Sequence, residues 1–281
     1  RAQAEKLAVL PEVRHSERFR AFLAAGTPPP LPSALSYPDA GLSEEDVRLA
    51  LDVGMATFIL HVEARVANHC GEGFYTIGPC GEELLAGAGL ALRVGDAAAL
   101  HYRHLSTSLV RALRAGRTMQ QVMLDRARGF CISTLDPVGG GHHCLLGGGE
   151  TDFIVSSTLA SQAPPAVGRA AGLRLAHHLK IQRPRLAADA VSYVSVGDGS
   201  VNNAHFLSAV NLAEYMQHRG FQCPVVFGIS DNGVCISLRG HGWLDRFLEQ
   251  RLGMPVFRAD GNILAEVYSA TSLAAEYARR R

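Results

Sequence analysis

The stretch YVSVGDGSVNN at residues 193–203 and the stretch PVVFGISDNG at residues 224–233 decide the fold. Each opens with an apolar run of strand length and ends in a polar loop that contains glycine, and the residues between them have helical character. A strand–helix–strand unit of this kind places its two strands parallel to one another. We therefore predict an α/β fold in which a parallel sheet carries helices on both faces.

The two polar loops also carry the residues that suggest chemistry. Parallel strands bring both loops to the carboxyl edge of the sheet, where open α/β folds bind ligands. There Asp198 and Asn232 would face one another and, with a backbone carbonyl and diphosphate oxygens, supply the oxygen ligands that magnesium requires. Gly197 and Gly199 let the main chain approach phosphate, and the next helix points its N-terminus at the anion. The alternative is an acidic turn and an unrelated Asn-Gly turn.

The sequence Gly197-Asp198-Gly199, followed by a spacer and then Asp231-Asn232, resembles the motif of thiamine-diphosphate-dependent enzymes. The resemblance implies the thiamine-diphosphate-binding fold and two cofactors, thiamine diphosphate and magnesium. It assigns the metal to Asp198, Asn232 and the carbonyl of Val234, and it assigns phosphate contacts to the backbone of Gly199 and Ser200.

Two features of the spacer depart from the family pattern. The spacer from Ser200 to Ser230 is a few residues longer than in the family. We expect the extra residues at 217–222, where helix gives way to strand and insertions cost little. Ser230 also stands where relatives carry charged residues, which puts one contact on the phosphate side in question.

Two further segments resemble the α subunits of the 2-oxo acid dehydrogenases. Tyr102-Arg103 ends a short predicted strand at 97–102 and resembles the pair that meets the cofactor there, where the forked donors of the Arg clasp diphosphate. In the glycine-rich loop 139–143, His143 resembles the catalytic histidine that lines the active-site channel, and His142 is the alternative. Without the resemblance, a Tyr-Arg pair is ordinary surface. Paired histidines suggest a metal, but no third ligand at matching spacing is present, so we do not expect zinc.

The segment SSTLASQAP at residues 156–164 resembles the branched-chain member of the family more than the pyruvate member. In the branched-chain type this cluster of hydroxyls and an amide holds potassium, and neighbouring side chains contact the aminopyrimidine. The resemblance therefore assigns a potassium site to Ser156, Thr158, Ser161 and Gln162, and a cofactor contact to Ser157 and Leu159. The alternative is ordinary helix capping by Ser and Thr.

The rest of the chain divides into an arm and one domain. Residues 1–42 form an N-terminal arm and proline-rich linker that we expect to wrap or pack on something else. Residues 43–281 form the thiamine-diphosphate-binding domain, with helices at 49–67, 119–128 and 265–280 and a further strand and Asp-Gly turn at 256–262. The chain stops before the further strand and histidine-bearing loop of the relatives, so we expect a domain that lacks the usual C-terminal end.

Composition excludes several classes of protein. The 281 residues are 47% hydrophobic and 19% charged, which is enough to bury a large core. A net charge of +1 gives no argument for nucleic acid or an anionic membrane, and no apolar run approaches the length of a bilayer span. The six cysteines include no CxxC pair, which is typical of a reducing compartment.

The resemblance as a whole implies the α subunit, or the α-like half of a fused polypeptide, of a 2-oxo acid dehydrogenase. Such a subunit is active only with a β-type partner, in a heterotetramer, and passes the acyl group of a small 2-oxo acid, branched-chain rather than pyruvate, to a lipoyl-bearing acyltransferase. The implied compartment is the mitochondrial matrix or a bacterial cytoplasm. Two alternatives stay open: a non-catalytic relative acting as a structural or assembly subunit, and a transketolase-type enzyme.

Overall fold

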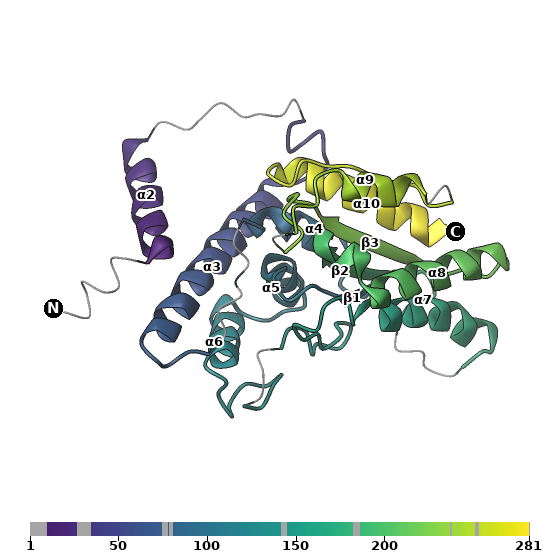
Figure 1. Ribbon diagram of the computed structural model, residues 1–281, viewed down its shortest axis with the longest axis horizontal. Helices are drawn as coiled ribbons and strands as arrows, with labels where there is room; N and C mark the ends of the chain where they lie inside the picture. The colour runs from purple at the N-terminus through teal and green to yellow at the C-terminus, as the bar shows by residue number, and fades with distance from the viewer. Residues whose placement is uncertain are drawn as a thin grey trace.

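The computed structural model describes residues 10–26, 35–74, 78, 81–141, 145–181, 186–236, 238–250 and 253–280. Within these residues three parallel strands form one sheet in the order β1 (Ala97–Ala99), β2 (Ser192–Gly197) and β3 (Val225–Ser230) (Figure 1). The helical elements are α2 (Pro11–Ala25), α3 (Glu44–His69), η1 (Glu83–Leu85), α4 (Ala86–Ala91), α5 (Leu105–Arg114), α6 (Met119–Phe130), α7 (Ala163–His178), η2 (Asp198–Asn202), α8 (Ala204–His218), α9 (Trp243–Glu249) and α10 (Leu264–Arg280). The predicted α/β architecture with a parallel sheet is confirmed.

The register of the sheet brings the ends of its strands together. β2 pairs with β3 from Ser192 opposite Val225 to Gly197 opposite Ser230. β1 pairs with β2 in the same direction, with Ala99 opposite Val194. The segments that follow the three strands therefore leave the sheet at the same carboxyl edge.

Helices cover both faces of the sheet, as the sequence predicted. Successive residues of a strand point to opposite faces, and Tyr193 packs in a core with residues of α3, α4, α5 and α10, whereas Val194 and Val196 pack in a second core with residues of α7, α8 and α9. Figure 1 shows α7 and α8 running side by side along the sheet. All six residues of β2 are buried, as expected for a central strand of a parallel sheet.

The predicted helices at 49–67, 119–128 and 265–280 are confirmed as α3, α6 and α10. α3 begins with a capping box, because Ser43 Oγ accepts from Asp46 N at 3.1 Å and the Asp46 carboxylate accepts from Ser43 N at 3.1 Å. The residues at 217–222, where we expected an enlarged spacer, form the end of α8 and the connection to β3.

Two strand predictions need correction. The strand predicted at 97–102 ends at Ala99, because the N–H of His101 donates to the side-chain hydroxyl of Ser195 at 2.9 Å rather than to a backbone carbonyl of β2. The strand predicted at 256–262 is wrong: residues 255–260 are exposed and form no strand. Its Val256 and Phe257 have strand propensity, but propensity does not form a strand without a neighbour to pair with. The Asp-Gly turn is present, and Asp260 Oδ1 accepts from Asn262 N at 2.8 Å.

The described part of the N-terminal arm packs on α3. Glu12 of α2 forms an ion pair with Arg65, whose Nε lies 2.9 Å from Glu12 Oε1, and the ring of Phe19 lies 6.3 Å from the ring of Phe58. The prolines of the linker lie outside the described residues, and the boundary at residue 42 stays a prediction.

A buried ion pair fastens the last helix to the sheet. Asp96, which precedes β1 and is 1% exposed, binds Arg279 of α10 and accepts from Val191 N at 3.0 Å. The same carboxylate therefore joins the start of β1, the start of β2 and the end of α10.

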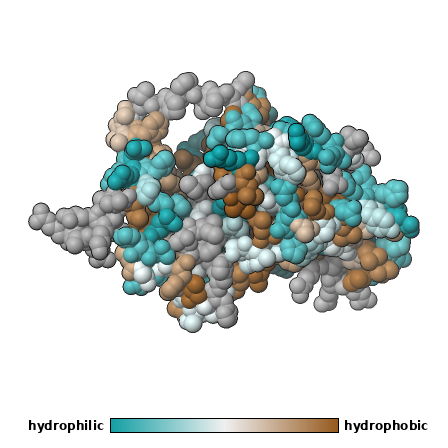
Figure 2. Space-filling view, viewed as in Figure 1, coloured by the Kyte–Doolittle hydropathy of each residue, from teal (hydrophilic) through white to brown (hydrophobic). Residues whose placement is uncertain are grey.

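Apolar side chains also reach the surface of the protein. Figure 2 shows hydrophobic patches between hydrophilic residues on one face. On α8 the side chains of Leu207, Leu212 and Tyr215 are each more than a third exposed. No helix in the described part of the chain is both long and apolar enough to cross a membrane.

Candidate functional site

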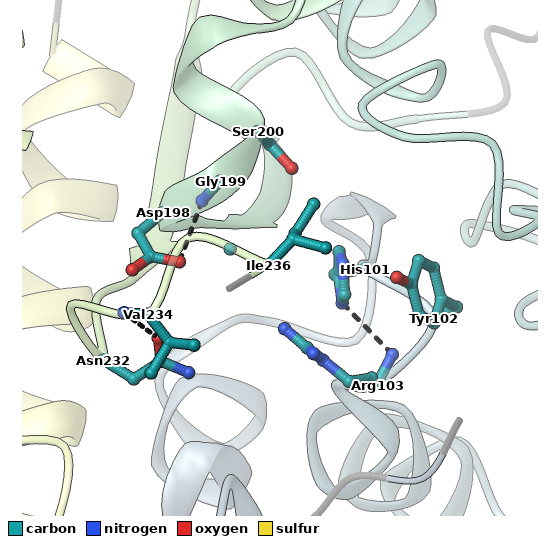
Figure 3. Close-up of a pocket in the computed structure, with 10 residues that line it drawn as sticks. His101, Tyr102, Arg103, Asp198, Gly199, Ser200, Asn232, Val234 and Ile236 are labelled. Atoms are coloured by element: carbon teal, nitrogen blue, oxygen red, sulfur yellow. Dashed lines mark hydrogen bonds between the residues drawn. The ribbon is translucent and has the colours of Figure 1, made fainter. Parts of the chain in front are cut away.

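A cavity of about 220 Å³ opens at the carboxyl edge of the sheet. Its wall is built by segments that follow all three strands, and Figure 3 shows their side chains converging on it. The described residues that line it are His101, Tyr102, Arg103, Gly197, Asp198, Gly199, Ser200, Asn232, Val234 and Ile236. The structure therefore brings together seven residues that the sequence nominated from three distant segments: Tyr102, Arg103, Asp198, Gly199, Ser200, Asn232 and Val234.

Asp198 is the buried carboxylate of the cavity and directly follows β2. Its Oδ1 accepts from Gly199 N at 2.8 Å and its Oδ2 accepts from Cys235 N at 3.2 Å. The side chain is 4% exposed. Two backbone N–H groups from two different loops therefore fix the orientation of the carboxylate, and each oxygen keeps a lone pair for a ligand.

Asn232 lies in a tight loop after β3. Its Oδ1 accepts from Val234 N at 2.9 Å, and the Oδ1 of Asp231 accepts from Gly233 N at 2.9 Å. Gly233 adopts the left-handed conformation (φ 68°) that this turn requires. Figure 3 shows the Asp198 carboxylate directed toward this loop, so the predicted pair of oxygen donors shares one cavity.

The glycines on either side of Asp198 allow neighbouring side chains to approach the main chain closely. A methyl group on Gly199 would lie 2.9 Å from Cγ1 of Ile236, and one on Gly197 would lie 3.3 Å from Nη2 of Arg103. Cys235 and Ile236 are both in the left-handed region (φ 46° and 55°), which is uncommon for residues other than glycine and rarer still for the β-branched Ile236. This conformation turns the side chain of Ile236 back over Gly199 and into the cavity (Figure 3).

Ser200 supplies an unpaired hydroxyl. Its Oγ is buried and has no hydrogen-bond partner among the described residues. Buried polar atoms are nearly always paired, so an exception that lines a cavity indicates a group that a ligand would satisfy. Within the described residues no three His, Cys, Asp or Glu side chains gather as a metal site. A cation here would therefore depend on the carboxylate of Asp198, the amide of Asn232, a backbone carbonyl and oxygens of the ligand itself, which is the oxygen set that magnesium accepts.

Arg103 is the one Lys or Arg among the described residues that line the cavity. Its Nε lies 3.7 Å from Oε2 of Glu82, and neither of these buried atoms forms a hydrogen bond within the described part of the chain. The cation is therefore held by attraction but keeps its donors available for an anion.

Glu82 lies behind Arg103 in a polar network that the sequence did not reveal. Its Oε1 accepts from Ser230 Oγ at 3.0 Å. The ring of His104 links two serines, with Nε2 3.2 Å from Ser230 Oγ and Nδ1 2.8 Å from Ser195 Oγ. Burial alone raises the pKa of Glu82, but His104, Arg103 and the bond from Ser230 outweigh it and hold that pKa at about 2. The hydroxyl of Ser230 therefore belongs to this hydrogen-bond network.

His101 is the second residue that sequence reasoning missed. It is 2% exposed, lines the cavity, and accepts from the backbone N of Arg103 through Nδ1 at 3.2 Å. Burial, and then His104 and Arg103, lower its pKa to about 3, so the ring is neutral near pH 7. The available signal was the sequence His101-Tyr102-Arg103-His104, in which histidines flank the nominated pair.

The segment at 156–162 forms a turn of its own outside the cavity. Ser156 Oγ donates to Thr158 Oγ1 at 3.1 Å, and Ser161 Oγ donates to the carbonyl of Thr158 at 2.9 Å. Gln162 is buried, and its Nε2 donates to the carbonyl of Ser195 at 2.9 Å. No side chain of a described residue caps α7, so these hydroxyls stabilise the turn rather than the helix start.

Of the remaining nominated residues, two belong to the described part of the chain and do not line the cavity. Ser157 and Leu159 are absent from the described residues that line it. His143 and its alternative His142 lie outside the described residues. The assignments of potassium, aminopyrimidine contact and catalysis to these segments stay predictions.

Comparison with known proteins gives one family. The family model described as "Dehydrogenase E1 component" matches residues 55–281. The chain is similar to the 2-oxoisovalerate dehydrogenase subunit alpha 2, mitochondrial, of Arabidopsis thaliana, with 34% identity over 134 residues, which are 46% of this chain and 25% of that protein. It is also similar to the 2-oxoisovalerate dehydrogenase subunit alpha, mitochondrial, of Mus musculus (31% identity over 198 residues, 67% of this chain and 40% of that protein) and of Homo sapiens (30% over 198 residues, 67% and 39%). The matched part thus spans at most 40% of the length of these relatives.

Proposed function

The chain belongs to the dehydrogenase E1 component family, and on that premise we propose that it is the thiamine-diphosphate- and magnesium-binding α subunit, or α-like half, of a 2-oxo acid dehydrogenase. One observation carries the proposal. Asp198, Asn232 and Arg103 come from the ends of three different strands and line one cavity beside the unpaired, buried hydroxyl of Ser200.

The residues of the cavity fit a magnesium diphosphate. The side-chain oxygens of Asp198 and Asn232 and the carbonyl of Val234 would hold the metal. Arg103 and the hydroxyl of Ser200 would donate to the diphosphate. When bound, the thiazolium ring would supply the electron sink for decarboxylation. The task of this chain is to hold and orient the anionic end, because the buried carboxylate of Asp198 is already oriented by two backbone N–H groups and the half-buried Arg103 is paired with Glu82.

The relatives support a branched-chain substrate and a partner chain. All three are named as α subunits of 2-oxoisovalerate dehydrogenase, and all three are mitochondrial. We propose a branched-chain 2-oxo acid as substrate, a β-type partner that completes the active site, a lipoyl-bearing acyltransferase as acceptor, and the mitochondrial matrix as the compartment. The exposed Leu207, Leu212 and Tyr215 of α8 support a surface that another chain covers.

The second candidate is a non-catalytic subunit with the same fold. The observation that favours it is the position of Ser230, where relatives carry charge: its hydroxyl binds Glu82, so the cavity wall has a single described Lys or Arg side chain, and that cation faces a carboxylate. A subunit of this kind would keep the sheet and the cavity without binding the cofactor tightly.

Binding by the purified chain separates the two candidates. At a free concentration of one hundred times the Kd, thiamine diphosphate with magnesium would stabilise the protein by about 2.7 kcal/mol, which raises the Tm of a chain of this size by about 5 °C. Asp198→Asn should abolish the magnesium-dependent shift, while the same change at the exposed Asp52 should keep it. If the unmodified chain shows no shift and no heat of binding, the non-catalytic candidate stands. The substrate is then tested by decarboxylation of 2-oxoisovalerate against pyruvate in the presence of the β-type partner.

A further inference from the structure

A diphosphate in this cavity needs hydrogen-bond donors besides the guanidinium of Arg103. Arg103 is the one Lys or Arg side chain that lines it in the described part of the chain, and the nearby Ser230 hydroxyl is committed to Glu82. A diphosphate carries several acceptor oxygens, and each one that is buried requires a donor. Two polar rings line the described wall of the cavity, the phenol of Tyr102 and the imidazole of His101, and only the imidazole is almost fully buried.

The hydrogen bonds of His101 fix which ring nitrogen carries the proton. Nδ1 accepts from the backbone N–H of Arg103 at 3.2 Å, so Nδ1 holds no proton. A neutral imidazole then carries its proton on Nε2, which makes Nε2 a donor. No hydrogen bond from any described residue engages Nε2. The ring is 2% exposed and lies in the cavity wall, so Nε2–H is the polar group that His101 has left for a ligand (Figure 3).

We propose that His101 is a binding residue of this cavity and that its neutral imidazole donates a hydrogen bond from Nε2 to the diphosphate. The inference rests on the proposed function. A neutral donor suits this position because a second positive charge beside Arg103 would be disfavoured by repulsion in the ligand-free cavity. The turn that carries Tyr102 and Arg103 thus presents two donors of different charge, a guanidinium and an imidazole N–H, to the same anion.

Three variants separate a binding role from a structural one. His101→Phe keeps a ring of similar size but removes both nitrogens. His101→Gln keeps an acceptor and a donor, and it should restore binding. His69→Phe makes the same change at an exposed position at the end of α3 and serves as the control. The probes are magnesium pyrophosphate, thiamine diphosphate with magnesium, and thiamine without phosphate, each titrated by calorimetry into the full chain.

We expect His101→Phe to weaken the binding of magnesium pyrophosphate and of thiamine diphosphate by about ten- to one-hundredfold, since a hydrogen bond to a charged acceptor is being removed. Binding of thiamine without phosphate should not change. An NMR spectrum of the protein labelled with ¹⁵N at histidine should show His101 neutral and protonated at Nε2. The chemical shift of that proton should change when magnesium pyrophosphate is added.

The outcomes distinguish the two proposals. If the unmodified chain binds neither thiamine diphosphate nor pyrophosphate, the proposed function and this inference both fail. If the unmodified chain binds and His101→Phe binds equally well, or the Nε2 proton does not respond to pyrophosphate, the role of His101 is overturned while the proposed function stands.

Discussion

The ion-pair network behind the cavity makes a quantitative prediction about acid stability. Folding lowers the pKa of Glu82 from 4.5 to about 2, because His104, Arg103 and Ser230 outweigh the effect of burial. A carboxyl group whose pKa is lowered in the folded state stabilises the fold above its unfolded pKa, and this stabilisation is lost as the pH falls toward the folded pKa. At about 1.4 kcal/mol per pKa unit, Glu82 contributes about 3 kcal/mol at neutral pH, and about 2 kcal/mol of this is lost between pH 6 and pH 3.

Glu82→Gln tests this number. The variant cannot titrate, so its free energy of unfolding should fall by about 2 kcal/mol less than that of the unmodified protein between pH 6 and pH 3. Urea unfolding followed by circular dichroism across that range measures the difference. Glu276→Gln, at an exposed position of α10, makes the same chemical change and should leave the pH dependence as it is in the unmodified protein. Equal pH dependence for Glu82→Gln and the unmodified protein would refute the assignment of a strongly held carboxylate at position 82.

Three further predictions concern packing, the buried ion pair and the unpaired hydroxyl. Gly199→Ala should destabilise the protein by about 1–3 kcal/mol in urea unfolding, because the added methyl group meets a side-chain carbon at 2.9 Å, whereas Gly168→Ala, with open space on α7, should be neutral or stabilising. Arg279→Ala should destabilise by about 3–5 kcal/mol because it leaves the buried carboxylate of Asp96 without its cation, and Arg280→Ala on the exposed side of the same helix should change stability by less than about 0.5 kcal/mol; a small effect at Arg279 would contradict the buried pair. Ser200→Ala should leave the Tm of the ligand-free protein unchanged or raised, yet weaken cofactor binding about tenfold in calorimetry; equal binding would show that the hydroxyl faces no ligand.

The core of the fold was predictable because its signals are local. The apolar run that ends at Gly197 and the one that ends at Ser230 are each long enough to define a buried strand, and the helix between them requires that the strands be parallel. Asp198 and Asn232 follow those strands directly, so their meeting at one edge needed no information beyond the strand ends.

Other parts depended on contacts that a sequence does not display. Glu82 and Ser230 are 148 positions apart, and the sequence around Glu82 does not indicate a partner on β3. The histidines that flank Tyr102-Arg103 were visible in the sequence, but only burial and the bond from the Arg103 amide show that His101 is neutral and faces the cavity. The strand predicted near Val256 failed for the converse reason, since β propensity indicates which residues tolerate a sheet and not whether a neighbouring strand is within reach.

The Asp198 carboxylate ties two loops into one rigid unit before any ligand arrives. Since its two oxygens bind amides from the segments after β2 and after β3, the distance between the halves of the site is set by the protein alone. Association then needs little ordering of the chain, and more of the interaction energy is retained as affinity. The ligand-free and ligand-bound forms of this edge should therefore superimpose closely. Loss of the hydrogen bond from the Cys235 N–H to Asp198 should slow ligand binding even when every group that contacts the ligand is unchanged.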